Sequence, residues 1–327
     1  MGLFTKKIKK TKTFKKDSDF VLLEGDCLDG IKTLPEKSVK LIITSPPYNL
    51  NKEYEEKSTL ENYLENMKPI IKEFDRVLRD DGSICWQVGN YVDKSEVFPL
   101  DIFYYDIFKE QGYKLRNRII WHFNHGLHGT KRLSGRYEVM CWFTKSDNYT
   151  FNLDDIRVPS KYPGKTNYKP GKNYGKLSGN PLGKNPSDYW EIMVKEWELG
   201  FWEIPNVKAN HPEKTLHPCQ FPIELVERCV FAFTNEKDVV LDPFSGVGSS
   251  MLAAVKNNRV GIGCELDEKY IKIAYEKIQL LEDGDLPYRE LGKKVSEAKG
   301  KVAKVPKEFK AYKLLDKISS LDQVCFL

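Results

Sequence analysis

The sequence lacks any long apolar run, and this absence limits where the protein can reside. No uninterrupted apolar stretch approaches the roughly 18 residues that a membrane-spanning helix needs, and no such stretch follows the lysine-rich start. We therefore expect neither a transmembrane nor a secreted protein. The seven cysteines are widely scattered and form no C-x-x-C pair, the spacing that would indicate a zinc or redox site. A reducing cytoplasm is the compartment that fits this usage.

The composition is that of a globular protein. Of the 327 residues, 40% are hydrophobic and 30% are charged, which makes a disordered chain or a fibrous architecture a poor fit. One large domain or two smaller ones would suit this length.

Positive charge is concentrated in three segments. Residues 1–16 carry seven lysines and residues 160–185 carry six, both without an acid, and residues 291–317 carry nine lysines against three acids. These segments supply +7, +6 and +6, which leaves −14 for the remainder of a chain whose net charge is +5. Separate basic segments on an acidic body are expected where those segments meet a polyanion, although lysine-rich termini are often simply solvated.

The middle basic segment has the strongest nucleic-acid signature. Within residues 160–185, lysines alternate with tyrosines and glycines. This pattern combines charges that pair with phosphates and rings that stack on bases, on an adaptable loop. The residues predicted to contact nucleic acid there are Lys161, Lys165, Tyr168, Lys172, Tyr174 and Lys176.

Strands alternate with helices at both ends of the chain. Apolar, β-branched runs predict strands at 19–28, 38–48, 83–89, 114–123, 136–145, 238–244 and 260–266. Apolar residues at helical spacing predict helices at 60–79, 221–233, 249–258 and 267–282. Along the chain, the strand at 238–244, the helix at 249–258, the strand at 260–266 and the helix at 267–282 form a βαβα unit. This unit is suited to a doubly wound sheet. Residues 146–210 lack this periodicity and are too long for an ordinary connection, so we expect a functional insertion or a small subdomain there.

A glycine-rich turn follows the strand predicted at 238–244. Gly246 and Gly248 let backbone approach a nucleoside, and Glu265, at the end of the next strand, can accept hydrogen bonds from ribose hydroxyls. A dinucleotide site would have a third glycine where Ser249 stands. The Asp242 carboxylate would also repel a pyrophosphate but attract a cationic sulfonium. The turn therefore favours S-adenosylmethionine, and a tight turn that binds nothing is the alternative.

A second motif, Thr44-Ser-Pro-Pro-Tyr48, ends the strand predicted at 38–48. The exocyclic amine of adenine or cytosine is a poor nucleophile because its lone pair is delocalised into the ring, unless two acceptors hold its N–H groups. The Ser45 hydroxyl and the Pro46 carbonyl could be those acceptors, and Tyr48 offers a ring on which an extruded base can stack. Pro-Pro-Tyr also occurs in plain turns, so the motif gains its weight from the sulfonium-binding turn.

With these two motifs, residues 20–282 resemble the S-adenosylmethionine-dependent DNA amino-methyltransferases of bacterial restriction-modification systems. In that family a (Ser/Asp/Asn)-Pro-Pro-(Tyr/Phe) element is catalytic and a D-x-F-x-G-x-G element binds the cofactor. Here the catalytic element comes first, which is similar to the circularly permuted beta class.

The resemblance implies an α/β fold, a Rossmann-like doubly wound mixed sheet with an inserted target-recognition region. The implied parts are a basic N-terminal arm at 1–19, a catalytic domain at 20–145 and 211–282, a target-recognition region at 146–210 and a lysine-rich tail at 283–327. That tail could be a DNA-facing arm, a partner-binding helix or a solvated segment.

The resemblance also implies individual roles. Catalysis falls to Ser45, Pro46, Pro47 and Tyr48. Cofactor binding falls to Asp26, Cys27, His217, Gln220, Asp242, Pro243, Phe244, Gly246, Gly248, Ser249, Glu265 and Asp267. Asp26 would contact the adenine of the cofactor, or it would simply cap a helix at 30–34. His217 and Gln220 belong to an H-P-x-Q-x-P element that lines the methionine end of the pocket.

A loop after the strand predicted at 114–123 contains His122, His125 and His128. Their spacing could suggest a metal site, but no cysteine or evident carboxylate completes a tetrahedral set, so we predict no metal. The competing interpretation is a loop on the catalytic face that meets the DNA backbone. The basic residues of that loop are Lys131, Arg132 and Arg136.

The predicted reaction is direct methyl transfer to the amine of a base flipped out of duplex DNA. Serine at position 45 favours N4 of cytosine, whereas Asn49-Leu50 resembles N6-adenine enzymes, so adenine remains the alternative. An RNA-base methyltransferase, a non-catalytic DNA-binding scaffold and a nucleotide-dependent oxidoreductase are less favoured. The resemblance implies double-stranded DNA as partner, a monomer or homodimer, and a cognate restriction endonuclease encoded nearby.

Overall fold

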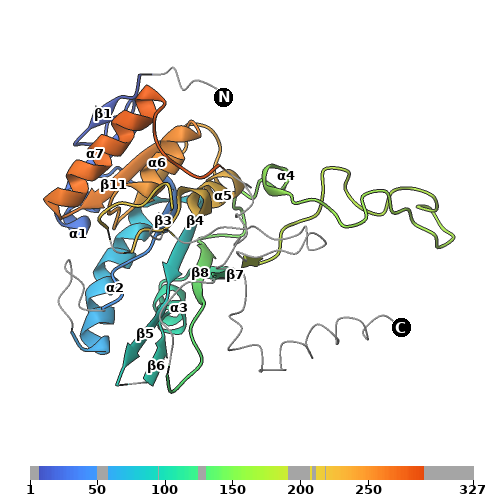
Figure 1. Cartoon of the computed structure of the whole chain (residues 1–327), viewed down its shortest axis with the longest axis horizontal. Helices are drawn as coiled ribbons and strands as arrows, with labels where there is room; N and C mark the ends of the chain where they lie inside the picture. Colours follow the sequence, from blue (N-terminus) through green and yellow to red (C-terminus); the bar gives the residue numbers. More distant parts are fainter. Residues whose placement is uncertain are drawn as a thin grey trace, which may run out of the picture. The chain divides into compact units, whose positions relative to one another are not determined.

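A nine-stranded mixed sheet forms the centre of the fold in the computed structural model (Figure 1). The structure describes residues 7–49, 58–94, 96–123, 130–190, 207, 211–217 and 219–290, all within one compact unit that spans residues 1–293. Along the sheet the strands lie in the order β1-β2-β11-β10-β3-β4-β8-β7-β9. Their bounds are β1 (Lys10–Thr11), β2 (Phe20–Glu24), β3 (Val39–Thr44), β4 (Leu78–Val88), β7 (Lys114–His122), β8 (Tyr137–Thr144), β9 (Tyr189–Trp190), β10 (Val239–Asp242) and β11 (Val260–Glu265). A separate hairpin consists of β5 (Asn90–Asp93) and β6 (Glu96–Pro99).

Parallel pairing joins the strands from β2 to β4, and antiparallel pairing joins β8 to β4 and to β7. The mixed sheet expected from the sequence is therefore confirmed. Every residue of β3 is buried, so its sequence is mainly apolar and does not alternate. The polar exceptions are Lys40, which pairs with Asp81 at 2.6 Å, and Thr44 at the end of the strand.

Helices cover both faces of the sheet. One face packs against α1 (Cys27–Lys32), α2 (Leu60–Val77) and α3 (Leu100–Glu110). The other packs against α5 (Ile223–Phe233), α6 (Ser249–Lys256) and α7 (Glu268–Asp283), visible at the orange end of the chain in Figure 1. Two hydrophobic cores result, one on each face. No helix in the described ranges has both the length and the apolar character needed to span a membrane.

The predicted helices are confirmed, with differences at their ends. The second helix stops at Val77 and not at 79, because Leu78 already pairs with Val39 in the sheet. The first begins at Cys27, ahead of the predicted range 30–34, because the Asp26 side chain caps it. The sequence did not predict α3 or the β5–β6 hairpin.

The sheet order brings together segments that are distant in the sequence. The neighbours β3 and β10 are about 200 residues apart along the chain, and β2, β11, β10 and β3 all point the same way. Their carboxyl ends therefore lie along one edge of the sheet, which is where ligands bind in open α/β sheets.

The insertion leaves the sheet after β8 and returns to it at β9. It begins with the short helix α4 (Leu153–Ile156) and continues as a long loop, drawn in green to yellow in Figure 1. Two isolated antiparallel bridges, Val158 to Lys184 and Thr166 to Leu177, hold the two sides of this loop together. The loop then pairs with the sheet through Tyr189, opposite Ile120.

Candidate functional site

The two sequence motifs meet where β3 and β10 end. The Thr44 hydroxyl donates to Oδ1 of Asp242 at 2.6 Å, and both side chains are buried. This hydrogen bond links the residue just before Ser45 to the first residue of the glycine-rich turn. The structure thus brings the predicted catalytic and cofactor motifs together.

Asp242 anchors the glycine-rich turn from inside. Besides Thr44, its carboxylate accepts the Phe244 N–H at 3.1 Å and the Ser250 hydroxyl. Burial raises the pKa of Asp242 to about 6, against the lowering effect of these hydrogen bonds. The observed contacts give this carboxylate a structural role in the turn, and a direct contact with a sulfonium stays a prediction.

The turn itself needs its two glycines. Gly246 has φ +51° and Gly248 has φ +79°, conformations that a side chain disfavours. A Cβ atom on Gly246 would lie 3.1 Å from Nε2 of His217. The hydroxyl of Ser249, the residue after Gly248, is buried and has no hydrogen-bond partner among the described residues. An unsatisfied hydroxyl beside a bare backbone is what a ligand-binding turn presents.

Glu265 and Asp267 lie beside this turn, after β11. Oε1 of Glu265 accepts the N–H groups of Leu266 at 3.0 Å and Asp267 at 2.8 Å, and burial raises the pKa of Glu265. The Asp267 side chain caps α7 by accepting the Lys269 N–H at 2.8 Å. Leu266, which the sequence analysis did not single out, is 73% exposed. A large apolar side chain so exposed next to Glu265 offers an apolar contact to a planar ring.

Asp26 and Cys27 follow β2, the neighbour of β11. Oδ1 of Asp26 accepts the N–H groups of Leu28 at 2.9 Å and Asp29 at 3.2 Å, so the helix-capping alternative is confirmed. Asp26 is exposed, and a contact with adenine stays a prediction. Cys27 is buried, which raises the pKa of its thiol to about 12 and keeps the thiol neutral.

His217 packs against the glycine-rich turn. Its ring lies 4.5 Å from that of Tyr270 on α7, and its Nδ1 accepts the Cys219 N–H at 3.2 Å. Burial and then Lys214 lower the pKa of His217 to about 4, so the imidazole is neutral at physiological pH. Gln220 is used within its own segment, because its amide bonds Glu213 O at 3.0 Å and Thr215 Oγ1 at 2.9 Å.

Buried ionisable side chains pack against the segment that carries His217 and Gln220. Glu213 accepts the N–H of Ile223 at 2.8 Å and that of Arg289 at 3.2 Å, and the Arg289 guanidinium pairs with buried Glu224. Lys277 of α7 lies close by and is buried, which lowers its pKa to about 8. Residues after α7, including Arg289, thus pack against the segment that carries His217, while the predicted tail beyond residue 290 lies outside the described residues.

The predicted catalytic motif is held in place by hydrogen bonds from two helices. The Pro47 carbonyl accepts the Tyr63 hydroxyl of α2 at 2.6 Å, and Tyr63 accepts the Tyr104 hydroxyl of α3 at 2.7 Å. The carbonyl of Pro46 accepts no hydrogen bond among the described residues. The hydroxyls of Ser45 and Tyr48, both half-buried, lie 2.8 Å apart.

A carboxylate and an amide from the neighbouring strands complete the catalytic side. Oε2 of Glu138 on β8 lies 3.5 Å from the Tyr48 hydroxyl and is hydrogen-bonded to Nε2 of Gln87 on β4. That amide nitrogen also lies 3.4 Å from the Tyr48 hydroxyl. A Cβ atom on Gly89 would lie 3.1 Å from the Tyr48 ring and 3.5 Å from Glu138, so the glycine makes room for both. The sequence analysis missed Glu138 and Gln87 because neither belongs to a recognisable motif.

The predicted DNA-contacting residues lie in two exposed stretches. The first leads into β8, where Lys131 and Arg132 are exposed and Arg136 is half-buried. The second is the long loop of the insertion, whose tyrosines Tyr168 and Tyr174 are 73% and 65% exposed. The lysines of that loop, Lys161, Lys165, Lys172 and Lys176, are all exposed.

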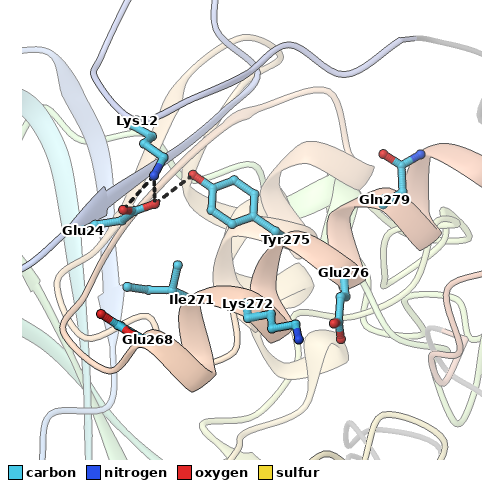
Figure 2. Close-up of a pocket in the computed structure, with 8 residues that line it drawn as sticks. All are labelled: Lys12, Glu24, Glu268, Ile271, Lys272, Tyr275, Glu276 and Gln279. Carbon is cyan, nitrogen blue, oxygen red and sulfur yellow. Dashed lines mark hydrogen bonds and ion pairs between the residues drawn. The ribbon is translucent and has the colours of Figure 1, made fainter.

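A hollow of about 590 Å³ lies between the N-terminal strands and α7 (Figure 2). Lys12 pairs with Glu24 at 2.7 Å across it, and the Tyr275 hydroxyl donates to the same carboxylate at 3.5 Å. The hollow adjoins the strand that carries Asp26, but none of the predicted site residues lines it.

Of the three histidines considered for a metal site, His122 is described, on β7. His122 stacks on Tyr189 with their rings 6.0 Å apart, while His125 and His128 lie outside the described residues. No cluster of potential metal ligands was found among the described residues.

Comparison with known proteins gives consistent matches. Residues 39–276 match the family model described as DNA methylase. The chain is 44% identical over 256 residues to Type II methyltransferase M.BglII of Bacillus subtilis, covering 78% of this chain and 68% of that protein. It is 34% identical over 273 residues to Type II methyltransferase M.ScaI of Streptomyces caespitosus, covering 82% and 84%.

Solved structures agree on the fold. The PvuII DNA methyltransferase, described as cytosine-N4-specific, matches with a TM-score of 0.60 and 19% sequence identity. The match covers 84% of this chain and 94% of that one.

Proposed function

Because this chain belongs to the DNA methylase family, we propose that Ser45, Pro46 and Tyr48 carry out methyl transfer to the N4 amine of cytosine in duplex DNA. The chain is an S-adenosylmethionine-dependent DNA methyltransferase of the N4 or N6 type. The observation that carries the residue assignment is the 2.6 Å hydrogen bond from Thr44 to Asp242, which joins the base-binding motif to the cofactor turn.

The residues around the turn fit S-adenosylmethionine. When bound, this cofactor supplies a methyl group on a positively charged sulfur. The unsatisfied Ser249 hydroxyl offers it a polar partner, and Gly246 lets the His217 ring pack close against the turn. Glu265 offers a carboxylate to ribose hydroxyls, and the exposed Leu266 offers an apolar surface to adenine. His217, being neutral, lines this pocket without repelling a sulfonium.

Ser45 and Pro46 orient the base amine. The Ser45 hydroxyl and the Pro46 carbonyl accept one N–H each, which turns the nitrogen lone pair away from the ring and towards the methyl group. Tyr63 fixes the neighbouring Pro47 carbonyl, so the backbone of the motif keeps its direction without rearrangement. Positioning of this kind can contribute several kcal/mol to rate acceleration, about 7 or more in favourable cases.

Serine at position 45 favours cytosine over adenine as the modified base. A hydroxyl is a neutral acceptor, whereas the carboxylate typical of N6-adenine enzymes is charged. The alternative, N6 of adenine, rests on Asn49, which follows the motif with φ +59° and bonds Ser58 through its amide.

The lysine- and tyrosine-rich loop of the insertion is the proposed reader of the target sequence. Its lysines supply phosphate contacts, and its exposed tyrosines supply stacking and hydrogen-bonding groups. A cognate restriction endonuclease encoded nearby, and action as a monomer or a homodimer, remain parts of the proposal that the family membership suggests.

Expression in a methylation-free bacterial host tests the reaction and the base together. Single-molecule sequencing of the host DNA distinguishes N4-methylcytosine from N6-methyladenine by polymerase kinetics. We expect one short motif that carries N4-methylcytosine at every occurrence. N6-methyladenine in that motif would select the alternative base, and unmodified DNA from cells that contain soluble, cofactor-binding protein would redirect the search to RNA or to a scaffold role.

A further inference from the structure

Tyr48 lies between a hydroxyl that faces the substrate and a carboxylate that does not belong to the motif. Its own hydroxyl is 2.8 Å from Ser45 Oγ and 3.5 Å from Oε2 of Glu138. Glu138 comes from β8, 90 residues further along the chain. The Thr44–Tyr48 motif itself contains no carboxylate, so within the motif alone the amine proton could only pass from Ser45 to solvent.

We propose that Glu138 is the final acceptor of the proton lost by the base amine, which reaches it from Ser45 through Tyr48. This inference rests on the proposed methyl transfer and adds a destination for its proton.

Methyl transfer is followed by three proton transfers, and atoms and charges balance over the whole sequence. A new N–C bond forms on the amine as the methyl group leaves sulfur, whose bonding electron pair stays on sulfur and neutralises it. The amine, now positively charged, gives a proton to the Ser45 oxygen. Ser45 passes its own proton to Tyr48, and Tyr48 passes its proton to Glu138. The carboxylate ends protonated and both hydroxyls are restored.

The neighbours of Tyr48 suit a relay. Burial and then the charge of Glu138 raise the pKa of Tyr48 well above its usual value, so Tyr48 keeps its proton until another arrives. Gln87 has no titratable group and holds Glu138 in place by hydrogen bonding. The 3.5 Å separation is long for a hydrogen bond, and catalytic contacts of this kind commonly shorten when substrate binds.

The described groups next to Glu138 come from three neighbouring segments. It faces Tyr48, which follows β3, and Gln87 on β4, and its cross-strand neighbour on β7 is Trp121. Cys219, in the 211–220 segment, also contributes to raising the pKa of Tyr48. Arg136 lies two residues before Glu138 along the chain. Tyr48 is thus the titratable group through which the carboxylate is connected to Ser45.

The decisive variant is Glu138→Gln, which keeps the size and the hydrogen bonding of the side chain but cannot take a proton. Single-turnover methylation of a cognate duplex is measured between pH 5 and 9, with saturating cofactor and DNA. In the wild type we expect the rate to fall at acidic pH as Glu138 becomes protonated. In Glu138→Gln we expect a rate about 100-fold lower at pH 8 and no acid-side fall. Glu110→Gln, at an exposed carboxylate of α3, is the matched control and keeps the wild-type profile.

A double-mutant cycle separates a relay from simple positioning. If the proton passes through Tyr48, then Tyr48→Phe and Glu138→Gln interrupt one path, and the double variant is hardly slower than either single variant. Affinities for cofactor and DNA, measured by calorimetry, stay within a factor of two or so in Glu138→Gln, and Glu138→Asp recovers part of the rate. Retention of both the wild-type rate and the acid-side fall in Glu138→Gln would overturn the relay. Absence of methylation in the wild type would instead contradict the proposed reaction.

Discussion

Ser45 Oγ points at its neighbour Tyr48 from the end of β3, and its side chain is the smallest that can accept a hydrogen bond there. We expect Ser45→Ala to bind cofactor and DNA like the wild type but to methylate about 100-fold more slowly, because one of the two acceptors for the amine is removed. Single-turnover kinetics with calorimetric binding controls check this. A wild-type rate in a variant that still binds both ligands would remove Ser45 from the proposed mechanism.

Asp242 makes stability depend on pH in a direction opposite to that of most carboxylates. Its folded-state pKa of about 6 lies above the ordinary 3.8, so between these values the folded state binds more protons than the unfolded state. The free energy of unfolding therefore falls as pH rises through this window, by about 3 kcal/mol for a pKa difference of about two.

Asp242→Asn removes that dependence. The amide oxygen can still accept from Thr44 and Phe244, and its NH₂ group can donate to Ser250. We expect the variant to be at least as stable as the wild type at pH 7, with a flatter stability curve from pH 4 to 6, measured by denaturant unfolding without cofactor. Asp29→Asn, at an exposed position of α1, is the control. Parallel curves for wild type and Asp242→Asn would show that the raised pKa is wrong.

At the scale of elements, α2 and α3 hold the catalytic motif through two tyrosine hydroxyls. Tyr63→Phe removes the donor to the Pro47 carbonyl and leaves the Tyr104 hydroxyl without its partner. We expect the free energy of unfolding to fall by about 1–3 kcal/mol. We also expect methylation to slow about 10-fold, because a loosened motif positions the amine less well.

Tyr113→Phe provides a matched control for that change. The Tyr113 hydroxyl is buried on the same side of the sheet but has no hydrogen-bond partner among the described residues. Its removal should leave stability unchanged or increase it, since an unsatisfied buried hydroxyl disappears. If both variants were destabilised equally, the hydroxyl chain from Tyr104 to Pro47 would not be what holds the motif.

Periodicity predicted the central elements because their burial is simple. A strand such as β3 is covered on both faces and is therefore mainly apolar without alternation, and the amphipathic spacing of α2 reflects burial of one face. The short edge strand β9 and the helix α3 were not predicted. β9 is too short to show a period. On α3, the buried Tyr104 makes its hydrogen bond to Tyr63, which is far away in the sequence, so the local pattern does not reveal the helix.

The same contrast applies to the site. Ser45 and Gly246 were found because each sits in a local pattern that its chemistry requires. Glu138 was not, because its importance comes from the pairing of β8 with β4, which brings it to Tyr48 from 90 residues away. Local sequence also gave no indication that the Asp242 carboxylate would be occupied by three hydrogen bonds, two of them from its own turn and helix.

At the scale of the whole molecule, the long loop of the insertion carries a group of exposed lysines. We expect the combined change of Lys165, Lys169 and Lys172 to Gln to weaken DNA binding. We also expect the slope of log affinity against log salt to become shallower by about one for each phosphate that a lysine no longer neutralises. Cofactor affinity should be unchanged. Titrations at several salt concentrations measure the slope.

The control for that experiment has the same charge change elsewhere. Lys32, Lys72 and Lys109 are exposed on α1, α2 and α3, on one face of the sheet. Their combined change to Gln should alter the slope much less. Equal slopes for the two triple variants would mean that the loop does not meet the DNA backbone.

The loop that carries those lysines is closed at its base. Val158 and Lys184 exchange backbone hydrogen bonds of 3.1 and 2.9 Å, and the Arg157 guanidinium donates to the Gly183 carbonyl at 3.0 Å. The two ends of the segment from 158 to 184 are thus fixed side by side, independently of what lies between them. A loop with fixed ends can be exchanged for one of different length at little cost in closure entropy. The base of the loop therefore makes it exchangeable: if the loop reads the target sequence, as proposed, a new loop grafted at this base would direct the enzyme to another DNA sequence and leave the ends of β3 and β10 as they are.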